Sequence, residues 1–143
     1  MGCDIHGFVE VLHKGEWYAY DKIPLGVRNY ALFGLIAGVR NDDVKPVSLP
    51  KDIPKDASEV VKLEVKHWGV DGHSHTWLSK TEMKKVYDYM EKIMHKEHNK
   101  ERKELWLEWG MDSIAYQLYS YGGYFLGENK EYQDVRMIIW FDN

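Results

Sequence analysis

The sequence predicts an α+β fold, in which a small, mainly antiparallel sheet packs against two or more helices. Three observations predict it. Residues 4–12 and 134–143 alternate in side-chain character, as β-strands do, and residues 79–94 repeat apolar side chains at helical spacing. With 143 residues, 44% of them hydrophobic, the chain has the length and the core material of a single domain over residues 1–143.

The first third of the chain predicts a hairpin and one helix. Residues 4–12 and 17–23 form two strands joined by the turn-forming HKGE. Residues 28–39 predict a short buried helix with Asn29 as its N-cap. Residues 40–58 hold three of the four prolines and predict a long surface loop.

The middle of the chain contains one ambiguous segment and one well-marked helix. Residues 59–68 fit a strand or a turn of helix equally well. Ser79 and Glu82 form an S-x-x-E capping box, which predicts that a helix begins there and runs to residue 94.

The last third predicts a second helix and a third strand. The helix is expected from about residue 105 to 119, with Gly122 and Gly123 as its end. Residues 134–143 are apolar on both faces near their middle, so we expect this strand at the centre of the sheet.

Two short motifs carry the residue types of a metal site. Asp4 and His6 are two positions apart on a predicted strand and therefore point the same way. Asp71, His73 and His75 have the same spacing, and the glycine among them leaves the backbone free to turn. Mixed carboxylate and imidazole ligands suit Zn²⁺, Mn²⁺ or Fe²⁺ better than Ca²⁺ or Mg²⁺. We expect a shared divalent-metal site with Asp4, His6, His73 and His75 as ligands.

The two ends of the chain are expected to meet. If the first and last strands pair antiparallel, the start of one lies beside the end of the other. Asp142 then lies near Asp4 and His6 on one face, and Arg136 lies near Glu10. Asp142 joins Asp71 as a candidate for orienting a metal-bound water or acting as general base.

Charge and aromatic content narrow the choice of ligand. A net charge of −4 and a pI of about 6.0 disfavour non-specific nucleic-acid binding, which needs a basic face. Arg28, Arg40 and Arg136 are candidates for holding the phosphate of a small nucleotide-like ligand, with Trp77 and Trp140 stacking on it. A ligand site of this kind often lies between subunits, so a homo-oligomer is possible.

The sequence indicates a cytoplasmic protein. Its longest apolar run, residues 31–39, is far shorter than the ~20 residues that span a bilayer, and no secretory pattern opens the chain. The single cysteine, Cys3, fits a reducing compartment. It falls on the opposite strand face from Asp4, so we expect a buried structural thiol.

Part of the motif pattern resembles calcineurin-like metallophosphoesterases. CDIHG is similar to the opening D-x-H motif of that family, and GHSH to its closing G-H-x-H. The resemblance implies that Asp4, His6, His73 and His75 ligate metal ions that activate water against a phosphoester. The family's G-D and G-N-H-D/E motifs are absent, so we interpret the likeness as shared ligand chemistry without common descent.

Most of the chain resembles a group of small bacteriophage and prophage proteins. They open with MGCDIH, carry R-N-Y-x-L-F and DGHSHxW segments, and end with DVR…WFDN, and this chain has all four. The resemblance implies a phage-like origin, location in a bacterial host cell, and one intact domain. It brings no established activity. Its site candidates are the motif residues Asp4, His6, Arg28, Asp71, His73, His75, Arg136 and Asp142.

Three functions remain open at this point. The first is a metal-dependent hydrolase of a phosphate ester or nucleotide-like substrate. The second is a counter-defence protein that sequesters a small nucleotide signal or a host factor. The third is a closed structural metal site that ties the first strand to the central motif.

Overall fold

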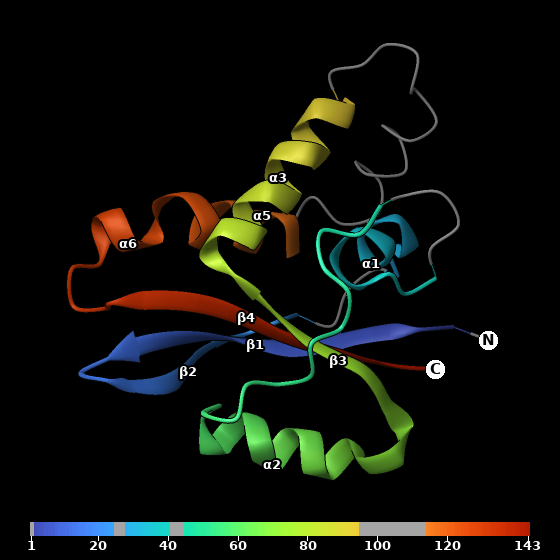
Figure 1. Cartoon of the computed structure of the whole chain (residues 1–143), viewed down its shortest axis with the longest axis horizontal. Helices are drawn as coiled ribbons and strands as arrows, with labels where there is room; N and C mark the ends of the chain where they lie inside the picture. The colour runs from blue at the N-terminus through green and yellow to red at the C-terminus, as the bar shows by residue number, and fades with distance from the viewer. Residues whose placement is uncertain (1, 25–27, 41–44, 95–113) are drawn as a thin grey trace.

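The computed structural model describes residues 2–24, 28–40, 45–94 and 114–143 of the chain (Figure 1). Four strands form one antiparallel sheet in the order β2-β1-β4-β3. The strands are β1 (Asp4–His13), β2 (Glu16–Lys22), β3 (Gly72–Ser79) and β4 (Asp134–Asp142). The helical segments are α1 (Tyr30–Ala37), α2 (Glu59–Trp68), η1 (Gly69–Asp71), α3 (Lys80–Met94), α5 (Ile114–Tyr119), η3 (Ser120–Tyr124) and α6 (Phe125–Glu128). The predicted α+β class and the antiparallel sheet are confirmed.

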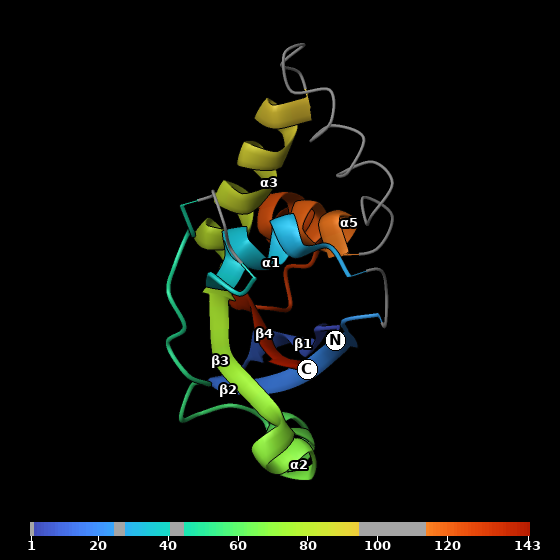
Figure 2. The same ribbon diagram turned by 90° about the vertical axis from the view of Figure 1, so that its right-hand side faces the viewer.

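The helices cover the two faces of the sheet unequally. Helices α1, α3, α5 and α6 lie on one face, and α2 alone lies on the other (Figures 1 and 2). We call these the large face and the α2 face. Because side chains alternate along β4, Val135, Met137, Ile139 and Phe141 enter the core of the large face. Ile138 and Trp140 enter a smaller core beneath α2.

Local sequence signals explain where the first helix begins and ends. The Asn29 side chain accepts a hydrogen bond from the Leu32 amide at 3.0 Å, as an N-cap does. Gly38 ends the helix in the left-handed conformation, at φ 71°. The predicted buried helix and its N-cap are therefore confirmed.

The capping box at the start of α3 also forms. The Glu82 amide donates to Ser79 Oγ at 3.2 Å, and the Ser79 amide donates to Glu82 Oε1 at 3.1 Å. Met83, Val86 and Met90 then bury one side of the helix against the sheet. The ambiguous segment 59–68 is the helix α2, which begins at its N-cap Ser58.

The sheet contains one strand beyond the three expected, and the expected end of the last helix was wrong. The DGHSHTW segment contributes a fourth strand, β3, which pairs with β4. Gly122 and Gly123 do not end a helix, because the chain passes through them in the π-helical turn η3 and continues into α6. The part of the second predicted helix before residue 114 lies outside the described residues.

The loop and the central strand agree with the sequence. Residues 45–58 of the predicted loop form neither helix nor strand, and residues 41–44 of it lie outside the described residues. Strand β4 lies between β1 and β3, at the centre of the sheet. Within the described ranges, none of the helices combines the length and the apolar character needed to cross a bilayer.

Candidate functional site

The candidate site lies at the end of the sheet where the two termini meet (Figure 1). Strand β1 begins there, β4 ends there, and Asp4 and Asp142 are direct partners in the register. Strand β3 also begins there, with Gly72 opposite Asp142. The predicted pairing is confirmed in full, including Glu10 opposite Arg136 at the other end of the strands.

His6 and Asp142 form the closest pair at this end. His6 Nε2 lies 2.8 Å from Asp142 Oδ1, and His6 is 9% exposed. An ionised carboxylate only accepts hydrogen bonds, so the imidazole N–H donates. The Trp68 ring, at the end of α2, lies over the imidazole with the ring centroids 4.1 Å apart. The pair is therefore shielded from water on the α2 side.

Asp4 is held by an arginine at the rim of the site. Arg28 Nε donates to Asp4 Oδ1 at 2.8 Å and Arg28 Nη2 to Oδ2 at 3.3 Å, a bidentate contact. This hydrogen-bonded guanidinium lowers the pKa of the Asp4 carboxyl, so the carboxylate stays ionised. A Cβ at residue 2 would overlap the Arg28 guanidinium, so this contact would have to shift if Gly2 were replaced.

Cys3 and Arg40 lie on the other side of the same strand end. Cys3 is fully buried among apolar residues of the large face, as predicted. Burial raises the pKa of its thiol, while the nearby Arg40 charge partly opposes that rise. Arg40 itself is exposed and lies over the Tyr30 ring, 5.4 Å from its centroid.

The three motif residues Asp71, His73 and His75 do not converge, contrary to the prediction from their spacing. A β-bulge interrupts β3 between His73 and Thr76, with Ser74 at φ 54°. The extra residue turns the two histidines to opposite faces of the sheet. His73 stacks on Phe141 of the large face, whereas His75 stacks on Trp140 beneath α2. Asp71 is exposed in the short turn η1.

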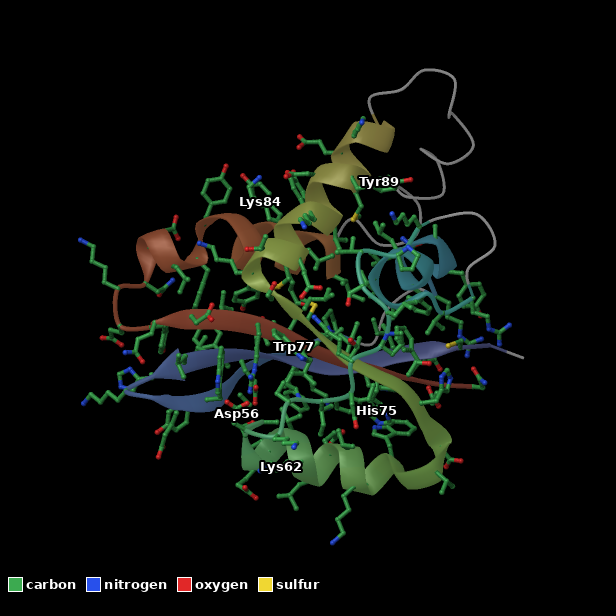
Figure 3. The ribbon with its side chains drawn as sticks, in the orientation of Figure 1. Asp56, Lys62, His75, Trp77, Lys84 and Tyr89 are labelled. Carbon is green, nitrogen blue, oxygen red and sulfur yellow. The ribbon has the colours of Figure 1, made fainter. Side chains whose placement is uncertain are left out.

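His73 and His75 have different neighbours. His73 Nε2 lies 3.2 Å from the side-chain oxygen of Asn143. His75, labelled in Figure 3, lies on the α2 side of β3, and its burial lowers the pKa of the imidazole. His6 and His75 both lie 6.3 Å from Trp140, measured between ring centroids. The α2 face therefore holds His6, Trp140 and His75 side by side on three neighbouring strands.

Three buried ring nitrogens on the α2 face have no hydrogen-bond partner. They are Trp68 Nε1, His75 Nε2 and Trp140 Nε1. A Cβ at Gly72 would lie 3.3 Å from His75 Nε2 and 3.5 Å from Trp140 Cδ1. The His75 and Trp140 rings therefore both lie beside this glycine. An unpaired buried donor costs about 1–3 kcal/mol, so such a group favours a bound acceptor. Trp68 was not among the residues predicted from the motifs, although its place just before Gly69 and the DGHSH motif was a usable signal.

The remaining candidate binding residues serve the fold. Arg136 is 5% exposed and is held by Glu10 and Asp56, with contacts of 2.7 and 3.0 Å. Trp140 is fully buried and offers no ring face to solvent. Trp77, labelled in Figure 3, is half-buried, and the Lys51 ammonium lies 4.1 Å from its ring centroid. The structure thus separates Arg136 and Trp77 from the His6 end of the sheet.

Among the residues that the structure describes, no three His, Cys, Asp or Glu side chains are grouped so as to hold a metal ion. The expected set is divided, because Asp4 binds Arg28, and His73 faces away from His6. His6 and Asp142 remain in contact, with Nε2 and Oδ1 2.8 Å apart. Two ligands about 2.1 Å from a tetrahedral Zn²⁺ lie roughly 3.4 Å apart, so the 2.8 Å pair would need to open only slightly.

Comparison with known proteins does not place the chain in a family. No family model matches it, and no curated protein or solved structure matches it either.

Proposed function

We propose that this protein is a metal-dependent hydrolase of a phosphate ester or nucleotide-like substrate, with its centre at His6 and Asp142. The observation that carries the proposal is the hydrogen-bonded His6–Asp142 pair, enclosed by Trp68 and bordered by ring nitrogens without partners. Such pairs commonly bind ions or transfer protons in hydrolytic sites.

In this proposal a Zn²⁺ or Mn²⁺ ion would be held by Asp142 and by His6 Nε2, which would first give up the proton that it donates to Asp142 in the free protein. The remaining positions on the ion would be open to water and substrate. Such an ion would lower the pKa of its water toward ~7 and would polarise a phosphoryl oxygen. The indole N–H of Trp68, whose ring lies over His6, is a donor for an oxygen of the same phosphoryl group. His75, kept neutral by its lowered pKa, can donate or accept a hydrogen bond there.

In this proposal, binding of the substrate phosphate to Arg28 releases Asp4 for the metal site. Its side chain is 47% exposed and binds Asp4 in the free protein. A phosphate group offers the same bidentate oxygen geometry as a carboxylate, so it competes with Asp4 for the guanidinium. Asp4, released next to its strand partner Asp142, then becomes a further ligand or base. Substrate binding and metal binding are thereby coupled.

Elemental analysis of untagged protein tests the proposal, combined with assays on phosphomonoester, phosphodiester and nucleotide substrates. We expect bound Zn²⁺ or Mn²⁺ in the wild type and in His73→Ala, because His73 lies on the opposite face. His6→Ala should lose the metal and lower turnover about 100-fold. Equal metal content in His6→Ala and wild type, or no hydrolysis after reconstitution with either metal, would overturn the proposal.

A second candidate is a protein that sequesters a small phosphorylated signal without turning it over. The unpaired indole N–H of Trp68 favours it, because this donor binds an oxygen without requiring a reactive water. If the phage-like origin that the sequence suggests is right, such a protein would act in counter-defence. Stoichiometric retention of an unchanged nucleotide, with no hydrolysis in the presence of metal, distinguishes this candidate from the enzyme.

A further inference from the structure

A separate groove lies on the large-face side of the molecule, away from the His6 end. It has a volume of about 380 Å³ and is open to solvent. One wall is α3, where Figure 3 labels Lys84, and the other is formed by Leu118 and the turn that follows α5. The proposed phosphoester chemistry does not involve these residues.

The π-helical turn η3 shapes the groove. Gly122 packs against the start of α3 so closely that a Cβ there would lie 2.9 Å from the Lys84 amide nitrogen and 3.1 Å from Met83 Cβ. The next residue, Gly123, lines the groove, and a Cβ there would meet nothing within 4 Å. The glycine pair therefore brings the turn close to α3 and leaves the space in front of it open. Such π-helical turns are frequent at functional sites.

Three tyrosines form an aromatic wall in the groove. The Tyr87 and Tyr119 ring centroids are 4.6 Å apart with the planes tilted by 48°, and the Tyr119 and Tyr124 centroids are 4.9 Å apart with a tilt of 57°. The rings are thus arranged as a bent series and not as a flat stack. A hydrogen bond to Tyr124 raises the pKa of the Tyr119 hydroxyl to about 12, so its phenol is neutral under ordinary conditions.

The charges in the groove favour a cation. Asp88 and Glu91 contribute two negative charges, and Lys84 contributes one positive charge. The Lys84 ammonium is already paired with Asp88 at 2.8 Å. In the described part of the chain no ion pair involves Glu91, whose charge acts on the Tyr87 hydroxyl. A net negative charge beside electron-rich ring faces is the arrangement that binds organic cations.

We propose that the groove between α3 and η3 binds an organic cation, an alkylammonium or guanidinium group, against Tyr87, Tyr119 and Tyr124 with Glu91 as its counter-ion. The group can be carried by a small molecule or by a peptide side chain, because the groove is open at its surface. This site is independent of the proposed hydrolase, and its test does not rely on activity.

The test is a ¹H NMR titration of the full chain with two matched probes. Choline carries a quaternary ammonium, and 3,3-dimethylbutan-1-ol has the same shape without the charge. We expect the choline methyl signal to move upfield, because protons over an aromatic face are shielded, with an affinity in the millimolar range. The uncharged alcohol should bind at least about fivefold more weakly. N-acetylarginine amide, used in a parallel titration, distinguishes a peptide-borne guanidinium from a small ammonium.

Variants locate the binding. Tyr124 is 53% exposed, so Tyr124→Leu should leave the fold intact while lowering choline affinity about fivefold, and Tyr124→Phe should retain most of it. Glu91→Gln should lower it about threefold. Tyr116→Leu, at another exposed tyrosine outside the groove, is the control and should change nothing. Equal binding of both probes, no upfield shift of choline at about 10 mM, or full binding by Tyr124→Leu would overturn the proposal.

Discussion

The two faces of the sheet are built from different chemistry. The large face buries a nearly continuous apolar core to which β1, β4, α1, α3 and α5 all contribute. Among the described residues, the α2 face has an apolar core of five buried residues, and beside it lie the buried polar side chains His6, Glu10 and Arg136. Since both faces belong to the same strands, the difference arises from which positions of the alternating pattern carry polar groups.

The large face and the α2 face therefore stabilise the fold in different ways. An apolar core stabilises in proportion to the area it buries, and it does not require particular partners. Buried polar groups need specific partners, and removing one member of a pair leaves the other uncompensated. We therefore expect substitutions in the large face to act through lost volume, and substitutions in the α2 face to act through lost pairing.

The largest effect is expected at Phe33 in the large face. The residue is fully buried in α1, and its ring contacts Phe141 with the centroids 5.1 Å apart. Phe33→Ala should lower the free energy of unfolding by about 4 kcal/mol, measured by urea denaturation. Phe33→Leu keeps most of the volume and should cost roughly 1 kcal/mol. If the two variants were equally stable, lost volume would not be what matters on this face.

The next effect is expected at Arg136 beneath α2. Arg136→Met leaves the fully buried Glu10 carboxylate without its guanidinium partner and should cost about 3 kcal/mol. Adding Glu10→Gln removes the uncompensated charge but keeps an oxygen for the Ser58 amide. The double variant should therefore recover at least half of the loss. A double variant that is less stable than Arg136→Met would contradict the pairing argument.

A smaller effect is expected at the capping box of α3, which belongs to the large face. Ser79→Ala removes the acceptor of the Glu82 amide and should cost about 1 kcal/mol. Ser79→Asp retains an acceptor at this position and should be close to wild type. Thermal denaturation followed by circular dichroism is sufficient to compare the two. A loss as large as that of Phe33→Ala would mean that Ser79 does more than cap the helix.

The smallest effect is a pH dependence from His75. Its pKa is lowered in the folded state by burial, so the unfolded chain binds the proton more readily. The stabilisation is present above the unfolded value near 6.5 and is lost as pH falls from there through the lower, folded value. His75→Gln should flatten the decrease in unfolding free energy below about pH 6.5. An unchanged pH profile in this variant would contradict the assigned burial effect.

Sequence periodicity predicted the pairing of the two ends. The alternation in residues 4–12 and 134–143 was regular enough to place Asp142 beside Asp4 and His6, and Arg136 beside Glu10. Residues 72–79 were harder, because Gly72 and the polar histidines resemble a turn more than a strand. The bulge that turns His73 and His75 to opposite faces arises from the pairing of β3 with β4. The periodicity of the sequence does not predict it.

The surroundings of the candidate site also depend on tertiary contacts. The His6–Asp142 hydrogen bond follows from the register, but the cover provided by Trp68 requires that residues 59–68 form a helix against the sheet. Gly122 is a comparable case. Two consecutive glycines usually mark the end of a helix. Here Gly122 instead allows the chain to pack closely against Met83. In both places contact with a distant segment outweighs the local signal.

The most direct test of the account is ¹⁵N NMR of the histidine rings during titration with Zn²⁺ in the presence of inorganic phosphate. If His6 and Asp142 form the centre of the site, the His6 Nε2 resonance should shift and saturate stoichiometrically. The shift should be lost in Asp142→Asn and retained in His73→Asn. A His6 resonance that stays unmoved while Zn²⁺ binds elsewhere, or a shift that survives in Asp142→Asn, would contradict it.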